Sequence, residues 1–352
     1  MSDPASAPTP GALPDPRFER QARFAPLGPA GQMRLSERRV LIVGCGALGG
    51  VLAQWLTRAG VGELVLVDRD VVEETNLPRQ VLFSEEHAAA GSPKVTAAAE
   101  TLASIGGPTR IEPHAVHLDA DQLLELGAGV DLILDGTDNM ATRYLVNDYA
   151  VREGVPWIYA GVVSSGGLVL SVQPGEGPCL RCVFPDPPPP GALPTCDTAG
   201  VLGPAVGAIA SMQAGLALRQ LSGAEPASPA LIDLDVWSGS ARRLSVPRAP
   251  ACPCCAERRF EFLEGATADD AVSLCGRNTV QVLPPPGAPA PAAELVAANL
   301  RSAGIQVLQV GPLLRFTADG NRVTLFPDGR ALVEGTEDTS KARAVVARWV
   351  GA

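Results

Sequence analysis

A glycine-rich segment and a nearby carboxylate could together hold a nucleotide. The segment GCGALGG places Gly44, Gly46 and Gly49 in G-x-G-x-x-G spacing. Glycines at this spacing let backbone amides approach a phosphate at the positive end of a helix. Asp68 ends the next apolar run, where a carboxylate can accept hydrogen bonds from ribose hydroxyls. These residues predict an adenine-nucleotide site, for which a nicotinamide-dependent oxidoreductase is the default, and the alternative is a tight turn without a ligand.

Three charged residues further along favour a triphosphate over a nicotinamide cofactor. Arg79 follows Asp68 closely, and Lys94 is one of only two lysines in the chain. Asp138 and Asn139 follow an apolar run, and the carboxyl ends of parallel strands form the crevice where ligands bind. Arg79 and Lys94 would neutralise phosphates, and Asp138 would hold magnesium. The alternatives are a helix cap for Asp138 and a solvated surface charge for Arg79.

Four cysteines form two Cys-x-x-Cys pairs that suit a metal. Cys179 and Cys182 lie in CLRC, and Cys252 and Cys255 in CPCC. Four thiolates suit a closed tetrahedral structural zinc site. Cys254 could replace either Cys252 or Cys255. A thioredoxin-like redox pair is disfavoured, because neither pair opens a helix directly after a strand.

The elements that must position these residues alternate between strand and helix. RRVLIVGCGALGG predicts a buried strand, a glycine turn and a helix that ends near Gly60. ELVLVDRD, DLILDGTDN and VPWIYAGV predict further strands. SPKVTAAAETLASI predicts a helix with Ser92 as N-cap and Pro93 as its first residue. This alternation is typical of a doubly wound, Rossmann-like parallel sheet.

The pattern changes after residue 165, where antiparallel strands surround a helix near 205–222. We expect the parallel sheet to continue into this antiparallel half. A small α+β domain should follow. The predicted organisation is a disordered tail at 1–14, a nucleotide-binding domain with a zinc site at 15–265, and a C-terminal α+β domain at 266–352. The elements expected in the last part are a strand at 279–283, a helix at 292–303, strands near 305–316 and 322–334, and a helix at 340–349.

Charge and composition argue against nucleic-acid and membrane partners. The 352 residues carry a formal net charge of −10, and no basic run is present, so nucleic acid and anionic membranes are disfavoured. Residues 199–218 are uncharged, but Pro204, Ser211 and Gln213 indicate a buried helix rather than a membrane span. The N-terminus lacks a secretory pattern. We expect a cytoplasmic protein.

Seven motifs in order resemble one family. They are RFERQ, GCGALGG, VDRDVVEETNLPRQ, GSPK, DGTDN, the paired Cys-x-x-Cys and TCDTAGVLGP. Together they are similar to MoeB, ThiF and HesA, the bacterial relatives of ubiquitin-activating enzymes, over residues 15–262. The resemblance implies ATP-dependent adenylation of the C-terminal Gly-Gly carboxylate of a ubiquitin-like sulfur-carrier protein of the MoaD or ThiS type, with release of pyrophosphate. The pathway would be molybdenum cofactor, thiamine or thio-tRNA synthesis.

The resemblance also implies roles for individual residues. Asp68 would bind the ribose, and Asp138 would bind magnesium and be needed for catalysis. Arg20 would act as an arginine finger on the ATP of the other subunit in a homodimer. The residues implied to contact the phosphates are Asn76, Arg79 and Lys94, with Asn139 in the same nucleotide site.

The resemblance also implies roles for the cysteines and for the C-terminal domain. Spatial closeness of the two Cys-x-x-Cys pairs in the family makes zinc credible despite their long separation. Cys196 matches a position that bonds covalently to the carrier or to sulfur in some members, and the alternative is a spectator thiol. The C-terminal domain is expected to help dock the carrier. The competing functions are an NAD-dependent oxidoreductase and a non-catalytic carrier-binding scaffold.

Overall fold

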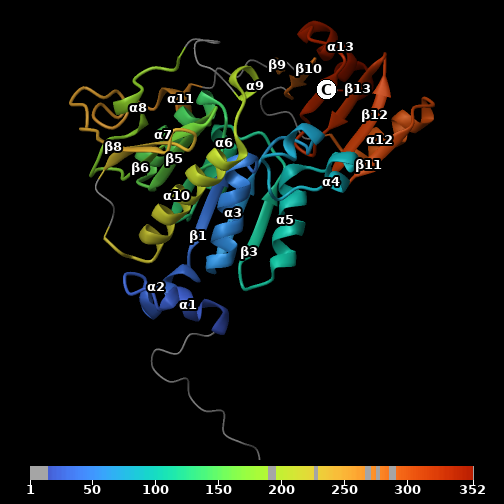
Figure 1. The fold of residues 1–352 in the computed structure, drawn as a ribbon. Coiled ribbons are helices and arrows are strands. Elements are labelled where there is room, and N and C mark those ends of the chain that lie inside the picture. Colours follow the sequence, from blue (N-terminus) through green and yellow to red (C-terminus); the bar gives the residue numbers. More distant parts are fainter. Residues whose placement is uncertain are drawn as a thin grey trace, which may run out of the picture.

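The computed structural model consists of two sheets with their helices (Figure 1). It describes residues 15–188, 196–225, 229–265, 271–274, 278–284 and 291–351, without the side chains of residues 196, 197 and 271–274. The expected tail at 1–14 lies outside the described residues.

The first sheet changes from parallel to antiparallel along its width. In the described chain it has eight strands in the order β3-β2-β1-β4-β5-β6-β7-β8. Pairing is parallel from β3 to β5 and antiparallel from β5 to β8. The strands are β1 (Arg39–Val43), β2 (Glu63–Val67), β3 (Arg110–His114), β4 (Leu132–Asp135), β5 (Trp157–Val163), β6 (Gly166–Val172), β7 (Ala230–Asp235) and β8 (Ser240–Ser245).

Helices cover both faces of this sheet, because alternate strand residues point to opposite sides. In β1, Val40 and Ile42 join one apolar cluster with α3, α5 and α10, while Leu41 and Val43 join another with α6 and α7. The sequence pattern therefore reads as a continuous apolar run rather than an alternating one. These helices are α3 (Ala47–Ala59), α5 (Lys94–Ile105), α6 (Ala120–Leu126), α7 (Met140–Glu153) and α10 (Gly203–Leu221).

The second sheet forms the core of the C-terminal domain and is antiparallel throughout. Its order among the described residues is β11-β12-β13-β14-β10-β9. One apolar cluster joins this sheet to its two helices. Its elements are β9 (Ala271–Leu274), β10 (Thr279–Val282), α12 (Ala293–Ser302), β11 (Val307–Val310), β12 (Leu313–Ala318), β13 (Asn321–Leu325), β14 (Ala331–Glu334) and α13 (Thr339–Trp349).

Short helices complete the two parts. At the N-terminus, α1 and α2 lie at the end of the first sheet remote from α9 (Figure 1). The short helices are η1 (Pro16–Phe18), α1 (Glu19–Ala22), α2 (Gly28–Leu35), η2 (Glu74–Asn76), α4 (Glu85–Ala90), α8 (Leu180–Val183), α9 (Cys196–Ala199) and α11 (Glu261–Glu264). None of the described helices combines the length and the apolar character that crossing a bilayer requires.

The fold class predicted from the sequence is confirmed, but the start of α5 is a correction. Ser92 does not cap this helix: α5 begins at Lys94, and Pro93 precedes it without a side-chain cap. The physical reason is pairing with a distant segment. Val71 forms a bridge with Pro93, and the amide of Lys94 donates to the carbonyl of Asp70 at 3.0 Å.

The turn after β1 requires glycines because three backbone segments meet there. Gly44 has a φ of +86°, which favours glycine. A Cβ on Gly49 would lie 1.8 Å from the carbonyl oxygen of Gly44. A Cβ on Gly136, which follows β4, would lie 2.3 Å from the same oxygen. Side chains at these positions would push the start of α3 away from the ends of β1 and β4.

Gly49→Ala should destabilise the protein, because the new methyl group has no room. We expect a loss of about 1–3 kcal/mol in the free energy of unfolding, as for other overpacked sites. Gly50→Ala is the matched control in the same helix, since a Cβ there would meet its nearest neighbour, Leu82, at 3.5 Å. Denaturant unfolding of both variants checks this, and equal stabilities would contradict it.

Candidate active site

One large cavity lies at the carboxyl ends of the parallel strands. Its volume is about 1430 Å³, which is ample for a nucleotide and part of a second substrate. Its wall contains most of the residues that the sequence indicated. They are Gly44, Gly46, Asp68, Arg79, Lys94, Asp138 and Asn139.

Asp68 fastens the glycine turn to the end of β2. One of its carboxylate oxygens accepts a hydrogen bond from the amide of Cys45 at 2.7 Å, and the other accepts from the amide of Asp70 at 2.7 Å. Burial raises the pKa of Asp68, and the charge of Lys94 opposes that rise. The carboxylate is thus fixed in the cavity wall, beside the turn that would receive a phosphate.

Lys94 is a buried cation among carboxylates. Its residue is 5% exposed, and its ammonium nitrogen lies 3.1 Å from a carboxylate oxygen of Asp70. Burial by itself lowers the pKa of Lys94, but the charges of Asp70, Asp68 and Asp138 outweigh it and raise the pKa above its ordinary value. The ammonium group is therefore charged at any physiological pH. Asp70 is a site residue that the sequence reasoning missed, although it lies two positions after Asp68.

In the DGTDN segment, Asp135 and Asn139 make hydrogen bonds within the fold, whereas Asp138 is exposed to the cavity. Both carboxylate oxygens of Asp135 are occupied, one by the amide and hydroxyl of Thr137 and the other by Nε of Arg143 at 3.0 Å. Asn139 is the N-cap of α7 and accepts from the amide of Thr142 at 2.9 Å. Asp138 is not the cap of this helix; it is exposed and lines the cavity.

Asn76 and Gly49 do not reach the cavity wall. Asn76 is 2% exposed, and its side-chain oxygen accepts from the amide of Glu73 at 3.1 Å. Arg79 does reach the wall and donates to the carbonyl of Thr75 at 2.7 Å. Asn76 therefore shapes the turn that presents Arg79.

Gln80 and His117 also line the cavity and were not predicted. Gln80 follows Arg79 in the NLPRQ motif and is 5% exposed. Burial and the nearby Arg69 lower the pKa of His117 to about 4, so its ring is neutral at pH 7. The NLPRQ motif could have indicated Gln80. No such motif surrounds His117, which follows the edge strand β3. The charged residues and the proline of β3 obscure the apolar pattern by which a strand is predicted.

Arg20 lies far from the cavity of its own chain. It belongs to α1, where the neighbouring Gln21 donates to the carbonyl of Ala59 at 3.0 Å, near the end of α3. The glycine turn opens the other end of that helix. Its 13 residues span about 20 Å at the usual rise of an α-helix. Contact between Arg20 and a nucleotide would therefore require a second chain.

The other half of the cavity is lined by the antiparallel part of the sheet. Gly161, Gly166 and Gly167 present bare backbone to it. Thr198 of α9 also lines it, two residues after Cys196. Of Cys196 only the backbone is described, at the start of α9. We call the side with Lys94 the charged half and the side with these glycines, which also carries Asp233, Asp235 and Arg242, the glycine-lined half.

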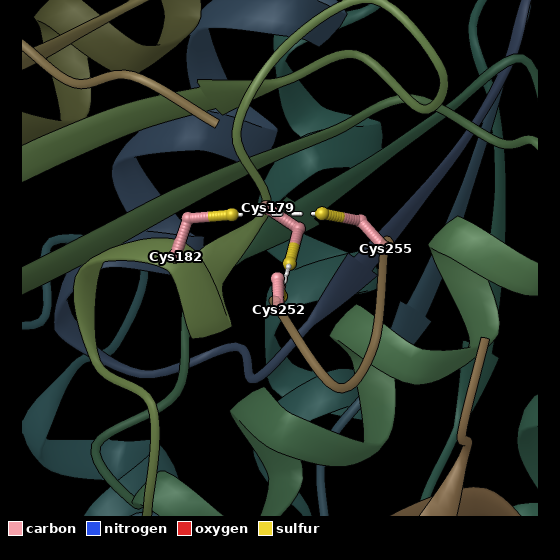
Figure 2. A group of neighbouring side chains, drawn as sticks. All are labelled: Cys179, Cys182, Cys252 and Cys255. Atoms are coloured by element: carbon pink, nitrogen blue, oxygen red, sulfur yellow. Dashed lines mark hydrogen bonds between the residues drawn. The ribbon is translucent and has the colours of Figure 1, made fainter. Parts of the chain in front are cut away.

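Four cysteine sulfurs gather next to the apolar cluster that contains α6 and α7 (Figure 2). The sulfurs of Cys179, Cys182, Cys252 and Cys255 lie within 4.8 Å of one another. The distances are 3.5 Å between Cys179 and Cys252 and 3.5 Å between Cys182 and Cys255. A tetrahedral zinc site with Zn–S distances of about 2.3 Å separates its sulfurs by about 3.8 Å. The donor set therefore fits zinc.

Cys254 is buried beside this cluster but is not one of its four sulfurs. Its sulfur accepts a hydrogen bond from the side-chain amide of Asn147 at 3.2 Å.

Within the cluster, burial and the hydrogen bond to Cys182 raise the pKa of Cys255 to about 11. Such thiols hold their protons at neutral pH, and a bound cation is what favours the thiolate.

Comparison with known proteins gives consistent matches. The ThiF family model matches residues 18–254. The sulfur carrier protein ThiS adenylyltransferase of Bacillus subtilis is 41% identical over 337 residues, which cover 95% of this chain and 99% of that protein. The sulfur carrier protein adenylyltransferase of Thermus thermophilus is 40% identical over 247 residues, which cover 68% of this chain and 90% of that protein.

Two further comparisons extend to a longer relative and to a solved structure. Adenylyltransferase and sulfurtransferase MOCS3 of Sus scrofa is 41% identical over 275 residues, which cover 76% of this chain and 60% of that protein. The crystal structure of E. coli MccB with ATP has a TM-score of 0.60 at 24% identity and covers 68% of this chain and 74% of that chain. The last match supports the fold.

Proposed function

The chain belongs to the ThiF family, and from this premise we propose that it adenylates the C-terminal Gly-Gly carboxylate of a ubiquitin-like sulfur-carrier protein with ATP. Relatives named as adenylyltransferases of such carriers, at 41% and 40% identity, support both the reaction and the kind of partner. The resemblance seen in the motifs is confirmed at the level of the family. At the site, the observation that carries the proposal is Lys94, a buried cation at the charged half of the cavity.

The proposed reaction joins the carrier to AMP. A carboxylate oxygen forms a bond to the α-phosphorus while the bond from that phosphorus to the β-phosphate bridging oxygen breaks. Pyrophosphate leaves with the electron pair of the broken bond. A chain-terminal carboxyl group has a pKa of about 3.5, so the nucleophile is ionised at neutral pH and needs no general base. The protein must then orient the reactants and stabilise charge.

The charged half of the cavity suits the triphosphate. Asp68 would bind the ribose, and Lys94 and Arg79 would contact phosphates. Asp138 would hold magnesium, since it is exposed to the cavity while both oxygens of Asp135 are occupied. Bound magnesium would neutralise part of the phosphate charge. Three carboxylates surround Lys94, so a polyanionic substrate needs this added positive charge.

Arg20 would supply further positive charge from a second subunit. Its place at the far end of α3 excludes a role in its own cavity and fits an arginine finger that acts across a homodimer. Asn76 and Asn139 would act indirectly, because their amide oxygens hold the turns before Arg79 and after Asp138.

The glycine-lined half of the cavity would receive the tail of the carrier. A Gly-Gly terminus is narrow, and the backbone of Gly161, Gly166 and Gly167 lines the part of the cavity that we assign to it. Cys196 would stand near its end, two residues before the cavity-lining Thr198. A ThiS-type carrier is our first candidate, because the Bacillus relative of that name matches 95% of this chain. The free cysteines and the use of ATP fit the reducing cytoplasm.

The four-cysteine cluster would hold a structural zinc ion. All four protein ligands are thiols, which leaves no open coordination position for catalysis. Zinc would join α8 to the segment 252–255, two parts of the chain 73 residues apart.

Lys94→Arg should lose most of the activity. The larger, forked guanidinium has little room in a buried site, and it replaces a compact charge with a planar one. We expect ATP–pyrophosphate exchange, measured with a Gly-Gly-ended carrier from the same genome, to fall by at least about tenfold. Lys341→Arg, at the exposed second lysine, should leave exchange unchanged. Near-normal exchange by Lys94→Arg would contradict the assignment, and no exchange by the unaltered protein with any such carrier would remove the proposed function.

Mixing two inactive variants tests the homodimer. Arg20→Ala and Lys94→Ala should each abolish exchange, whereas a mixed dimer keeps one site with both residues intact. Subunit exchange between equal amounts should therefore restore about a quarter of the original activity, if pairing in the symmetric dimer is random. Activity that stays at the level of the separate variants would refute the arginine finger.

Metal content tests the zinc site and separates the neighbouring thiols. Purified protein should contain about one zinc per chain, measured by atomic emission. Cys252→Ser should lose the metal, while Cys254→Ser should retain it because that sulfur lies outside the cluster. Equal zinc in both variants would show that the cluster is not a metal site.

A further inference from the structure

We propose that the C-terminal domain braces the backbone that carries Lys94, and that Arg315 and Arg330 are positioning residues for adenylation. This inference rests on the phosphate-binding role proposed for Lys94. The ThiF family model ends at residue 254, so both arginines lie outside it.

The braced backbone consists of two short segments that pair with each other. Residues 69–72 follow β2, and residues 90–94 run from the end of α4 into α5. The amide of Val72 donates to the carbonyl of Ser92 at 2.8 Å, and the amide of Lys94 donates to the carbonyl of Asp70 at 3.0 Å. In addition, the ammonium nitrogen of Lys94 lies 3.1 Å from a carboxylate oxygen of Asp70. The position of the ammonium group therefore depends on both segments.

Arg330 holds the first segment. It lies at the end of the turn between β13 and β14, is 0% exposed, and donates to the carbonyl of Arg69 at 2.6 Å. Its guanidinium lies over the ring of Phe326, 3.5 Å from the ring centre. Asp328 of the same turn accepts from the amide of His117 at 3.3 Å. This one turn thus contacts the backbone after β2 and the cavity wall after β3.

Arg315 holds the second segment. It projects from β12 and donates to the carbonyls of Ala90 and Gly91 at 2.8 and 2.7 Å. These carbonyls end α4, where a cation is favourable. A Cβ on Gly91 would lie 2.0 Å from the guanidinium, so the contact needs glycine at this position.

An apolar contact lies between the two arginines. Leu313, Phe326 and Leu332 form a small buried cluster with Val71 packed against it. Val71 is the residue that pairs with Pro93, directly before Lys94. The C-terminal domain therefore contacts the first segment at Arg69 and Val71 and the second at Ala90 and Gly91, and Figure 1 shows this domain beside α4.

Exchange kinetics of arginine variants test the brace. Arg315→Ala and Arg330→Met should lower kcat/KM for ATP by at least about tenfold, since small displacements at a reacting centre are costly. The KM for the carrier should change less than twofold, and Arg315→Lys should recover part of the loss. Arg322→Ala is the matched control, because this exposed arginine on β13 pairs with Glu334 of its own domain at 3.2 Å.

The outcomes separate the brace from the proposed function. If Lys94→Ala abolishes exchange while the Arg315 and Arg330 variants match Arg322→Ala, the brace is refuted and the proposed site stands. If Lys94→Ala retains exchange, the phosphate-binding role proposed for Lys94 is refuted, and the brace is refuted with it. A rise in the carrier KM with unchanged ATP kinetics would instead assign the domain to carrier docking and overturn the brace. Thermal unfolding checks that each variant is folded. If Arg330→Met is not folded, Arg315→Ala and Arg315→Lys, at a half-buried residue, decide the question.

Discussion

A buried ammonium group surrounded by carboxylates sets the requirements that the rest of the site meets. Removing the charge of Lys94 from water is unfavourable unless nearby anions compensate for it. Asp68 and Asp70 supply that compensation from the end of β2, and Asp138 supplies it from beyond β4. The parallel sheet brings these strand ends together on one edge. The order of the strands, the glycine turn after β1 and the start of α5 together determine where this charge lies.

Much of the nucleotide half could be predicted because its signals are local in sequence. Glycine spacing, an acidic residue at a strand end and an apolar run each depend on neighbouring residues. The predicted start of α5 was wrong because it depends on a segment distant in sequence. Ser92 and Pro93 have the composition of a helix start, but pairing with Val71 keeps them extended. Local propensity is a weak guide where a distant segment supplies the hydrogen bonds.

The remaining site residues depend on contacts that no local pattern contains. Asp70 matters because Lys94 folds back onto it, and Arg330 matters because a turn some 260 residues away in sequence contacts the carbonyl of Arg69. Sequence spacing favoured Cys252 over Cys254, and the structure shows that the sulfur of Cys254 accepts a hydrogen bond from Asn147. Helix capping was expected as an alternative role for Asp138, and Asn139 performs it instead.

The cysteine cluster has a topological consequence. It joins two points 73 residues apart, and the chain between them includes α9, β7 and β8, which line the cavity beside the glycines of β5 and β6. A metal clip across so long a loop removes conformational freedom mainly from the unfolded chain. The parts of the cavity would then differ in what secures them: the charged half by packing within its own sheet and against the C-terminal domain, and the part built by α9, β7 and β8 by metal–sulfur bonds that chelators or oxidants can break.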